Sequence, residues 1–240
     1  MAGGLVGAIA LGGGLSGCVS TQQKNARAKL SATRLLASRE PQRVTERNPD
    51  VRVLQVAVVR GRRSDAIVVD LRSRAARPLT DVPIAVGVRR TGGRAELLNE
   101  RGGLDWFQTH VPAIPAGGTA TWIFTARTTK VPAGQPFARV GVSPSPALSR
   151  AGSLPRIEAG LGAGRPAAAA VRAMLDNSSG IPQYRLQVYA VVRARGRYVA
   201  AGKATIEHLG TGERTTVRVP LTGHAPGGAV RVHAIPTIFE

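Results

Sequence analysis

Residues 67–88, IVVDLRSRAARPLTDVPIAVGV, decide the fold, and they recur as residues 171–192, VRAMLDNSSGIPQYRLQVYAVV. Each copy has an alternating apolar run, a polar loop, a proline and a second alternating run. The second copy follows the first after 104 positions without a gap, so that Pro182 matches Pro78. The apolar positions keep the same parity, and a one-residue slip would turn every core side chain outward. The alternation therefore predicts two half-buried strands in each copy.

The flanking sequence extends this all-β pattern. Further strands are predicted at residues 51–59, 94–99, 119–126 and 138–142, and no long helical pattern occurs in the first half. A later block also repeats, but only 95 positions separate Gly117 from Gly212. The first copy therefore carries nine extra residues between its third and sixth strands.

The pattern resembles the small immunoglobulin-like sandwich domains of bacterial surface proteins that are grouped as CARDB- and FxLYD-like. The matching residues are Leu175-Asp176-Asn177-Ser178 with Pro182, and Pro115-Ala116-Gly117 with Thr119 and Thr121. The resemblance implies two tandem immunoglobulin-like β-sandwiches, at residues 50–145 and 155–240, joined by a linker at residues 146–154. Because such sandwiches host many functions, the resemblance implies no particular activity.

The N-terminal segment is an apolar run, GGLVGAIALGGGLSGC, which extends from Gly3 to Cys18 and holds the only cysteine. It is short for a membrane-spanning helix, which needs about 20 residues. Its small-residue end is typical of a secretory segment. Such segments usually begin with Lys or Arg, but neither residue precedes this apolar run. An uncleaved signal anchor and an ordinary N-terminal tail are the alternatives.

The ending Leu15-Ser16-Gly17-Cys18 resembles the lipobox of bacterial lipoproteins. That resemblance implies that residues 1–17 are a signal peptide cleaved between Gly17 and Cys18. It also implies a diacylglycerol on the Cys18 thiol, which would hold the protein on the outer face of the bacterial plasma membrane.

The charge balance bounds the partners. The chain has 33 basic and 14 acidic residues and a formal net charge of +19. Such a field attracts anionic lipids, acidic wall polymers or nucleic acid without sequence specificity. No specific nucleic-acid partner is expected, because the sequence has no recognition helix or cluster of stacking aromatics. The basic tether at residues 18–49 either adds electrostatic membrane attraction to the lipid or is a soluble spacer.

No catalytic constellation, metal site or cofactor site is predicted. The four histidines, His110, His208, His224 and His233, lack the spacing of zinc ligands, and His208 and His233 are expected in strands or turns. If Cys18 is lipidated, the chain has no thiol nucleophile. An enzyme whose site the sequence does not reveal is a weaker alternative.

The insertion contains two adjacent aromatic residues, Trp106 and Phe107, which are candidate contacts for a partner protein or sugar. Alternatively the loop folds back and plugs the end of the sandwich, with one ring buried and the other exposed. A second candidate surface consists of residues on the parity opposite the apolar set, which are expected to cover solvated outer faces: Arg172, Arg185, Arg193, Arg218 and Arg231, joined by Tyr189.

Together these features favour a non-enzymatic, lipid-anchored envelope protein with a binding or scaffolding role. The alternative is an accessory subunit of an envelope enzyme or transporter complex.

Overall fold

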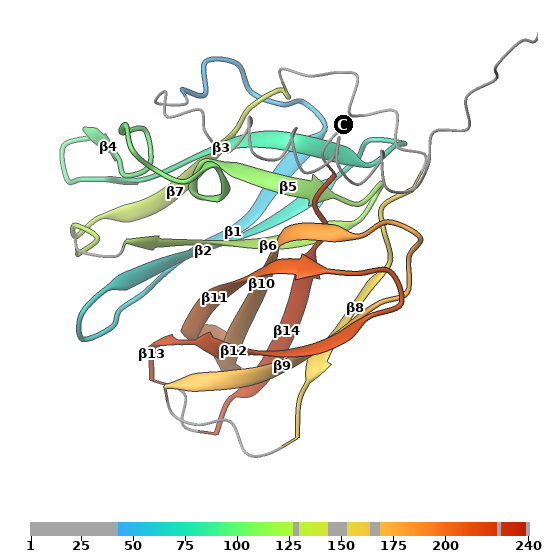
Figure 1. The fold of residues 1–240 in the computed structure, drawn as a ribbon. Helices are drawn as coiled ribbons and strands as arrows, with labels where there is room; N and C mark the ends of the chain where they lie inside the picture. The colour runs from blue at the N-terminus through green and yellow to red at the C-terminus, as the bar shows by residue number, and fades with distance from the viewer. Residues whose placement is uncertain (1–42, 127–129, 144–152, 164–168, 225–226, 239–240) are drawn as a thin grey trace, which may run out of the picture.

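The computed structural model describes residues 43–126, 130–143, 153–163, 169–224 and 227–238 (Figure 1). Within these ranges every regular element is an antiparallel β-strand, apart from one 3-10 turn. The predicted all-β class with two tandem immunoglobulin-like sandwiches is confirmed. The lipobox with Gly17 and Cys18, the tether up to residue 42, and most of the predicted linker lie outside the described residues.

The first sandwich has one sheet in the order β1-β2-β6 and a second sheet centred on β3. β7 pairs along one edge of β3, while β4 and β5 share its other edge. The strands are β1 (Val51–Val59), β2 (Asp65–Ser73), β3 (Leu79–Arg89), β4 (Ala95–Leu97), β5 (His110–Ile114), β6 (Thr119–Ala126) and β7 (Gln135–Val140), with the 3-10 turn η1 (Trp106–Gln108) before β5.

The second sandwich has sheets in the orders β12-β9-β8 and β13-β11-β10-β14. Its strands are β8 (Ile157–Leu161), β9 (Ala170–Asn177), β10 (Gln183–Ala194), β11 (Arg197–Leu209), β12 (Arg214–Pro220), β13 (Thr222–Gly223) and β14 (Ala229–Ile235). The repeat seen in the sequence is a repeat of topology, because β2, β3 and β6 occupy the places that β9, β10 and β12 occupy here. The nine extra residues accompany a split strand: the single β11 is replaced in the first sandwich by β4, η1 and β5.

The two copies share a backbone kink that the alternation does not reveal. Asp81 and Arg185 stand at equivalent positions, 104 residues apart, and have φ angles of 50° and 51°. Such left-handed angles are uncommon in residues other than glycine. At this kink the side chains of Asp81 and Arg185 therefore point in a direction that regular alternation along a strand would not give them.

Each sandwich has its own apolar core. Trp122, Phe124 and Ile67 are fully buried in the first, and Leu175, Leu186 and Leu209 in the second. A buried side chain also holds the polar loop after β9 in place. The Asn177 amide donates hydrogen bonds to the carbonyls of Ile181 (3.0 Å), Leu209 (3.3 Å) and Gly210 (3.0 Å).

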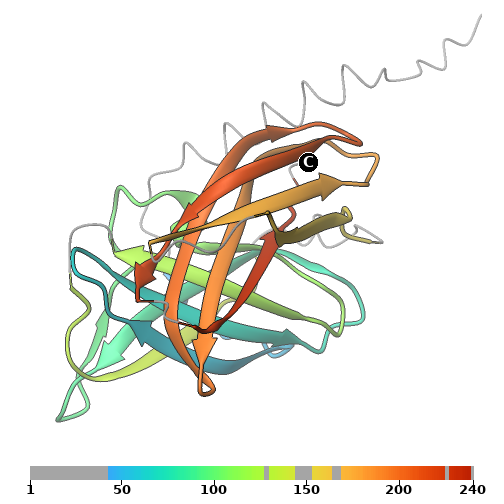
Figure 2. The same cartoon turned by 90° about the horizontal axis from the view of Figure 1, so that it is seen from below.

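The two sandwiches pack face to face, so that four sheets form four tiers (Figure 1). Seen from below, the strands of the second sandwich cross obliquely over those of the first (Figure 2). The inner tiers are β1-β2-β6 and β13-β11-β10-β14. Tyr189, Val191, Ala201 and Ile235 of the second sandwich belong to the same apolar cluster as Val68 of the first.

This contact corrects the prediction of a solvated outer face. Tyr189 is fully buried, and the partly exposed Arg193 hydrogen-bonds to Asp70 of the first sandwich, because β1-β2-β6 packs against the face that carries them. Arg172 and Arg218 are exposed as expected, directly opposite each other on β9 and β12.

Candidate binding groove between the two sandwiches

The Trp106–Phe107 segment lies inside the molecule. It forms the turn η1, in which Asp105 Oδ1 accepts a 2.9 Å hydrogen bond from the Phe107 N–H and Gln108 Oε1 accepts one from the Asp105 N–H. Both rings are buried, where extended backbone would have exposed one of them. The sequence Asp105-Trp-Phe-Gln108 has the form of a capping box, which could have predicted the turn.

This turn also touches the second sandwich. The guanidinium of Arg185 lies 3.3 Å from an Asp105 carboxylate oxygen and 6.0 Å from the centre of the Phe107 ring. The indole N–H of Trp122 donates to the Phe107 carbonyl at 3.2 Å. The aromatic pair therefore supports the junction between the sandwiches and offers no exposed ring to a partner.

A polar network centred on Asp70 fixes how the sandwiches meet. The Asp70 carboxylate accepts hydrogen bonds from Thr121 Oγ1 (2.6 Å), Arg193 (2.8 Å) and the Tyr198 hydroxyl (2.6 and 2.8 Å). Arg193 also donates to the side chain of Gln55 at 3.1 Å. Burial, followed by the hydrogen bond to Asp70, raises the pKa of Tyr198 to about 12, so the hydroxyl stays protonated and remains a donor.

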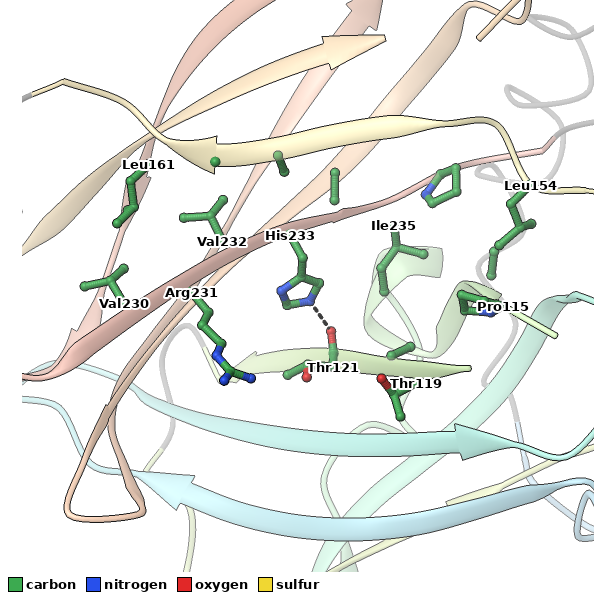
Figure 3. Close-up of a pocket in the computed structure, with 16 residues that line it drawn as sticks. Pro115, Thr119, Thr121, Leu154, Leu161, Val230, Arg231, Val232, His233 and Ile235 are labelled. Carbon is green, nitrogen blue, oxygen red and sulfur yellow. Dashed lines mark hydrogen bonds between the residues drawn. The ribbon is translucent and has the colours of Figure 1, made fainter. Parts of the chain in front are cut away.

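Beside this junction the sandwiches leave an open groove of about 550 Å³ (Figure 3). Most of its lining comes from three strands, β6 from the first sandwich and β8 and β14 from the second, and β5 adds Ala113. Its walls are mainly aliphatic and small, and its lining consists of Ala113, Pro115, Thr119–Thr121, Leu154, Ala159–Leu161 and Val230–Pro236. A groove of this size and composition is suited to an apolar ligand of moderate length.

His233 connects the two sandwiches at the groove floor. Its Nε2 lies 2.6 Å from the Thr121 carbonyl oxygen, a contact that Figure 3 shows as a dashed line. Because a carbonyl only accepts, the Nε2–H must be the donor. Burial lowers the pKa of His233, so the ring is neutral at pH 7. His233 is therefore a structural bridge, and among the described lining residues only Arg231 is charged at that pH.

Each of the three strands is at the edge of its sheet. Among the described residues β6 pairs only with β2, β8 only with β9, and β14 only with β10. An edge strand presents unpaired backbone N–H and C=O groups that can pair with another chain. Sequence reasoning missed this site, because the groove exists only where edges of three different sheets meet.

Two other buried groups contain titratable side chains that a catalytic site could use, but their contacts serve the fold. Asp81, His110 and Trp106 form a closed cluster, with the His110 ring stacked on the indole at 4.8 Å. Asp65 is fully buried and accepts hydrogen bonds from Arg60 and Lys130. Burial alone would raise the Asp65 pKa, but the Val131 N–H and these donors outweigh it and lower the pKa.

In the described part of the chain, no three His, Cys, Asp or Glu side chains gather as metal ligands would. His208 and His233 lie in β11 and β14, as expected. None of the helices found there has the length and apolar character that crossing a membrane requires.

No protein-family model matches the sequence, and no curated protein sequence does either. The solved structures that match include the C-terminal globular domain of an oligosaccharyltransferase from Pyrococcus abyssi, at 8% identity and a TM-score of 0.22, with 77% of this chain and 45% of that chain covered. Another is red sea bream transglutaminase, at 10% identity and a TM-score of 0.22, with coverage of 81% and 32%. This chain therefore spans less than half the length of either protein, and their activities do not bear on it.

Proposed function

We propose that this chain is a lipid-anchored protein of the bacterial cell envelope with a non-catalytic binding or scaffolding role. Two features support the proposal. The sequence Leu15-Ser16-Gly17-Cys18 supplies an anchoring point on the outer face of the plasma membrane. The groove between the sandwiches supplies a binding surface, and it is the observation that carries the proposed role.

The groove suits binding because its walls are held in place without a ligand. Strands of both sandwiches form it, and the Asp70 network and the His233–Thr121 hydrogen bond connect those sandwiches beside it. A preformed surface binds without first losing the conformational entropy of its own ordering. Anionic lipids and acidic wall polymers remain secondary partners, attracted by the net charge of +19.

The anchor is tested by metabolic labelling with an alkyne fatty acid. The wild-type protein should carry the label and fractionate with membranes, whereas Cys18→Ala should carry none, because the alkylated thiol is gone. Ser20→Ala is the matched control and should label like the wild type. Equal labelling of Cys18→Ala and the wild type would refute the anchor.

The binding role is tested in intact cells with a photo-cross-linking residue at position 119, in the groove, and another at position 216, on the outer face of β12. A partner that uses the groove should give a defined adduct at position 119 and none at position 216. Adducts at position 216 alone, or at neither position, would contradict a binding role for the groove. Identifying the adduct as an enzyme or transporter subunit would select the accessory-subunit alternative.

A further inference from the structure

In the described part of the second sandwich, β14 forms an edge of the four-stranded sheet. In a complete seven-strand immunoglobulin sandwich, the last strand pairs with the outer edge of the strand before it. Here β8, β9 and β12 form one sheet, and β14 follows β10 at the end of the other. Among the described residues no strand pairs with the outer edge of β14, and that edge borders the groove.

The first sandwich provides an internal comparison. There the equivalent strand is β7, and the chain that precedes β1 closes the end of its outer edge. The Asn48 N–H donates to the Val140 carbonyl at 2.9 Å, the Asn48 side chain donates to the Gly141 carbonyl at 3.3 Å, and Arg47 bridges Gly141. No such bond joins the described residues before β8 to β14. Among the described residues, the same edge is therefore capped in one copy and open in the other.

The open edge gives access to the apolar interior. β8 and β14 run side by side without a ladder between them (Figure 3). Val230, Val232 and Ala234 of β14 pack against the core of the second sandwich but remain only partly buried, and Leu161 of β8 is 47% exposed at the rim. A strand that entered here would find apolar contacts for alternate side chains.

Charge restricts the occupant further. Arg231 is exposed in the groove and forms no ion pair in the described part of the chain, and Arg72 lies directly opposite the groove residue Thr119 on the neighbouring strand. None of the described residues that line the groove is acidic. An extended segment that carries a carboxylate beside its apolar residues complements this surface better than a neutral or basic one.

We propose that an extended segment of a partner protein, with alternate aliphatic side chains and acidic flanks, pairs with the outer edge of β14 and extends the sheet β13-β11-β10-β14 by one strand. This inference rests on the proposed binding role and specifies the class of partner. Main-chain hydrogen bonds to β14 supply affinity, while the apolar wall and Arg231 supply selectivity.

The test uses the full chain purified in detergent and a probe peptide of eight residues. The peptide has valine at alternate positions, threonine between them and aspartate at both ends. We expect saturable binding with a Kd below about 1 mM and protection of β14 amides from hydrogen exchange. A peptide that is N-methylated at alternate residues keeps the side chains but loses the donors, and should bind at least about tenfold more weakly.

Three variants locate the site. Arg231→Glu and Leu161→Asp each change an exposed position and should weaken binding about tenfold. Arg218→Glu makes the same charge change on the exposed face of β12 and should bind like the wild type. Circular dichroism of each variant establishes that it is folded.

Several outcomes would overturn the proposal. These are no binding at about 1 mM, equal binding of the N-methylated peptide, and equal loss in Arg218→Glu. The wild type could instead form a dimer that Leu161→Asp dissociates, and bind no peptide. In that case the occupant of the edge would be a second copy of the chain and not a partner protein. Because the peptide is added to purified protein, a negative fatty-acid labelling result leaves this measurement unaffected.

Discussion

At the scale of single residues, the pair Asp81 and His110 shows how burial controls charge. Asp81 is 7% exposed and His110 is 6% exposed, and His110 Nε2 lies 3.7 Å from Asp81 Oδ1. Burial raises the pKa of Asp81 to about 6 and lowers the pKa of His110 to about 4. At pH 7 the carboxylate is therefore charged and the imidazole neutral, an arrangement without a full ion pair.

The two shifts have opposite effects on stability between pH 4 and pH 6.5. On acidification Asp81 takes up its proton first in the folded state, which increases stability between pH 6 and pH 4. His110 takes up its proton first in the unfolded state, which decreases stability between pH 6.5 and pH 4. In the wild type the two contributions largely cancel.

Separate substitutions should reveal each contribution. Relative to the wild type, Asp81→Asn should lose about 1–3 kcal/mol of unfolding free energy on going from pH 6.5 to pH 4, because only His110 then titrates. On going from pH 6 to pH 4, His110→Gln should gain a similar amount of unfolding free energy relative to the wild type, because only Asp81 then titrates. Urea unfolding at pH 4, 5, 6 and 7 measures both slopes, and curves parallel to the wild type would contradict the assignment.

At the scale of elements, the insertion shows how a side chain replaces the hydrogen bonds that are lost where a strand is split. Asn99 occupies the gap between β4 and β5 and is 1% exposed. Its Oδ1 accepts from the Val86 N–H at 2.7 Å, and its amide donates to the carbonyls of Ile84 (2.7 Å) and Gln108 (2.8 Å). The side chain replaces ladder bonds that the continuous strand β11 makes to β10 in the second sandwich.

Asn99→Ala should reduce the free energy of unfolding by about 2–4 kcal/mol, because it leaves buried backbone groups of β3 without partners. Asn48→Ala is the matched control: Asn48 makes two side-chain hydrogen bonds but is only partly buried, so its loss should cost less than about 1 kcal/mol. Denaturant unfolding compares the two. Similar losses in both variants would contradict the bridging role of Asn99.

At the scale of the whole molecule, the covered face between the sandwiches determines the shape. β2 is buried on both sides: Ile67 and Val69 face the core of the first sandwich, while Val68 and Asp70 face the second. The two domains therefore form one body, and the groove exists because their sheets diverge beside the interface.

Val191 lies in this interface and is 4% exposed. Val191→Asp buries an unpaired charge there and should destabilise the contact by about 3 kcal/mol, while both sandwich cores stay intact. In calorimetry the wild type should unfold in one cooperative transition, and Val191→Asp should unfold in two or in a broadened one. Thr216→Asp on the outer face of β12 should retain the wild-type profile. An unchanged sharp transition in Val191→Asp would show that the interface does not couple the sandwiches.

The sequence by itself determined the strands, their parity and the repeat, because alternation and turn residues act over a few neighbouring positions. The predicted strand at residues 119–126 coincides with β6, and the predicted extra nine residues lie where β4, η1 and β5 replace a single strand. Only the tertiary structure decided that Tyr189 is buried and Arg193 binds Asp70, that both insertion rings are buried, and that three sheet edges border a groove. These features depend on which outer sheet faces of the two sandwiches pack together. The sequence contains one indication of that packing, the unbroken apolar runs Ala66–Val69 and Tyr189–Val192, which are typical of strands buried on both faces.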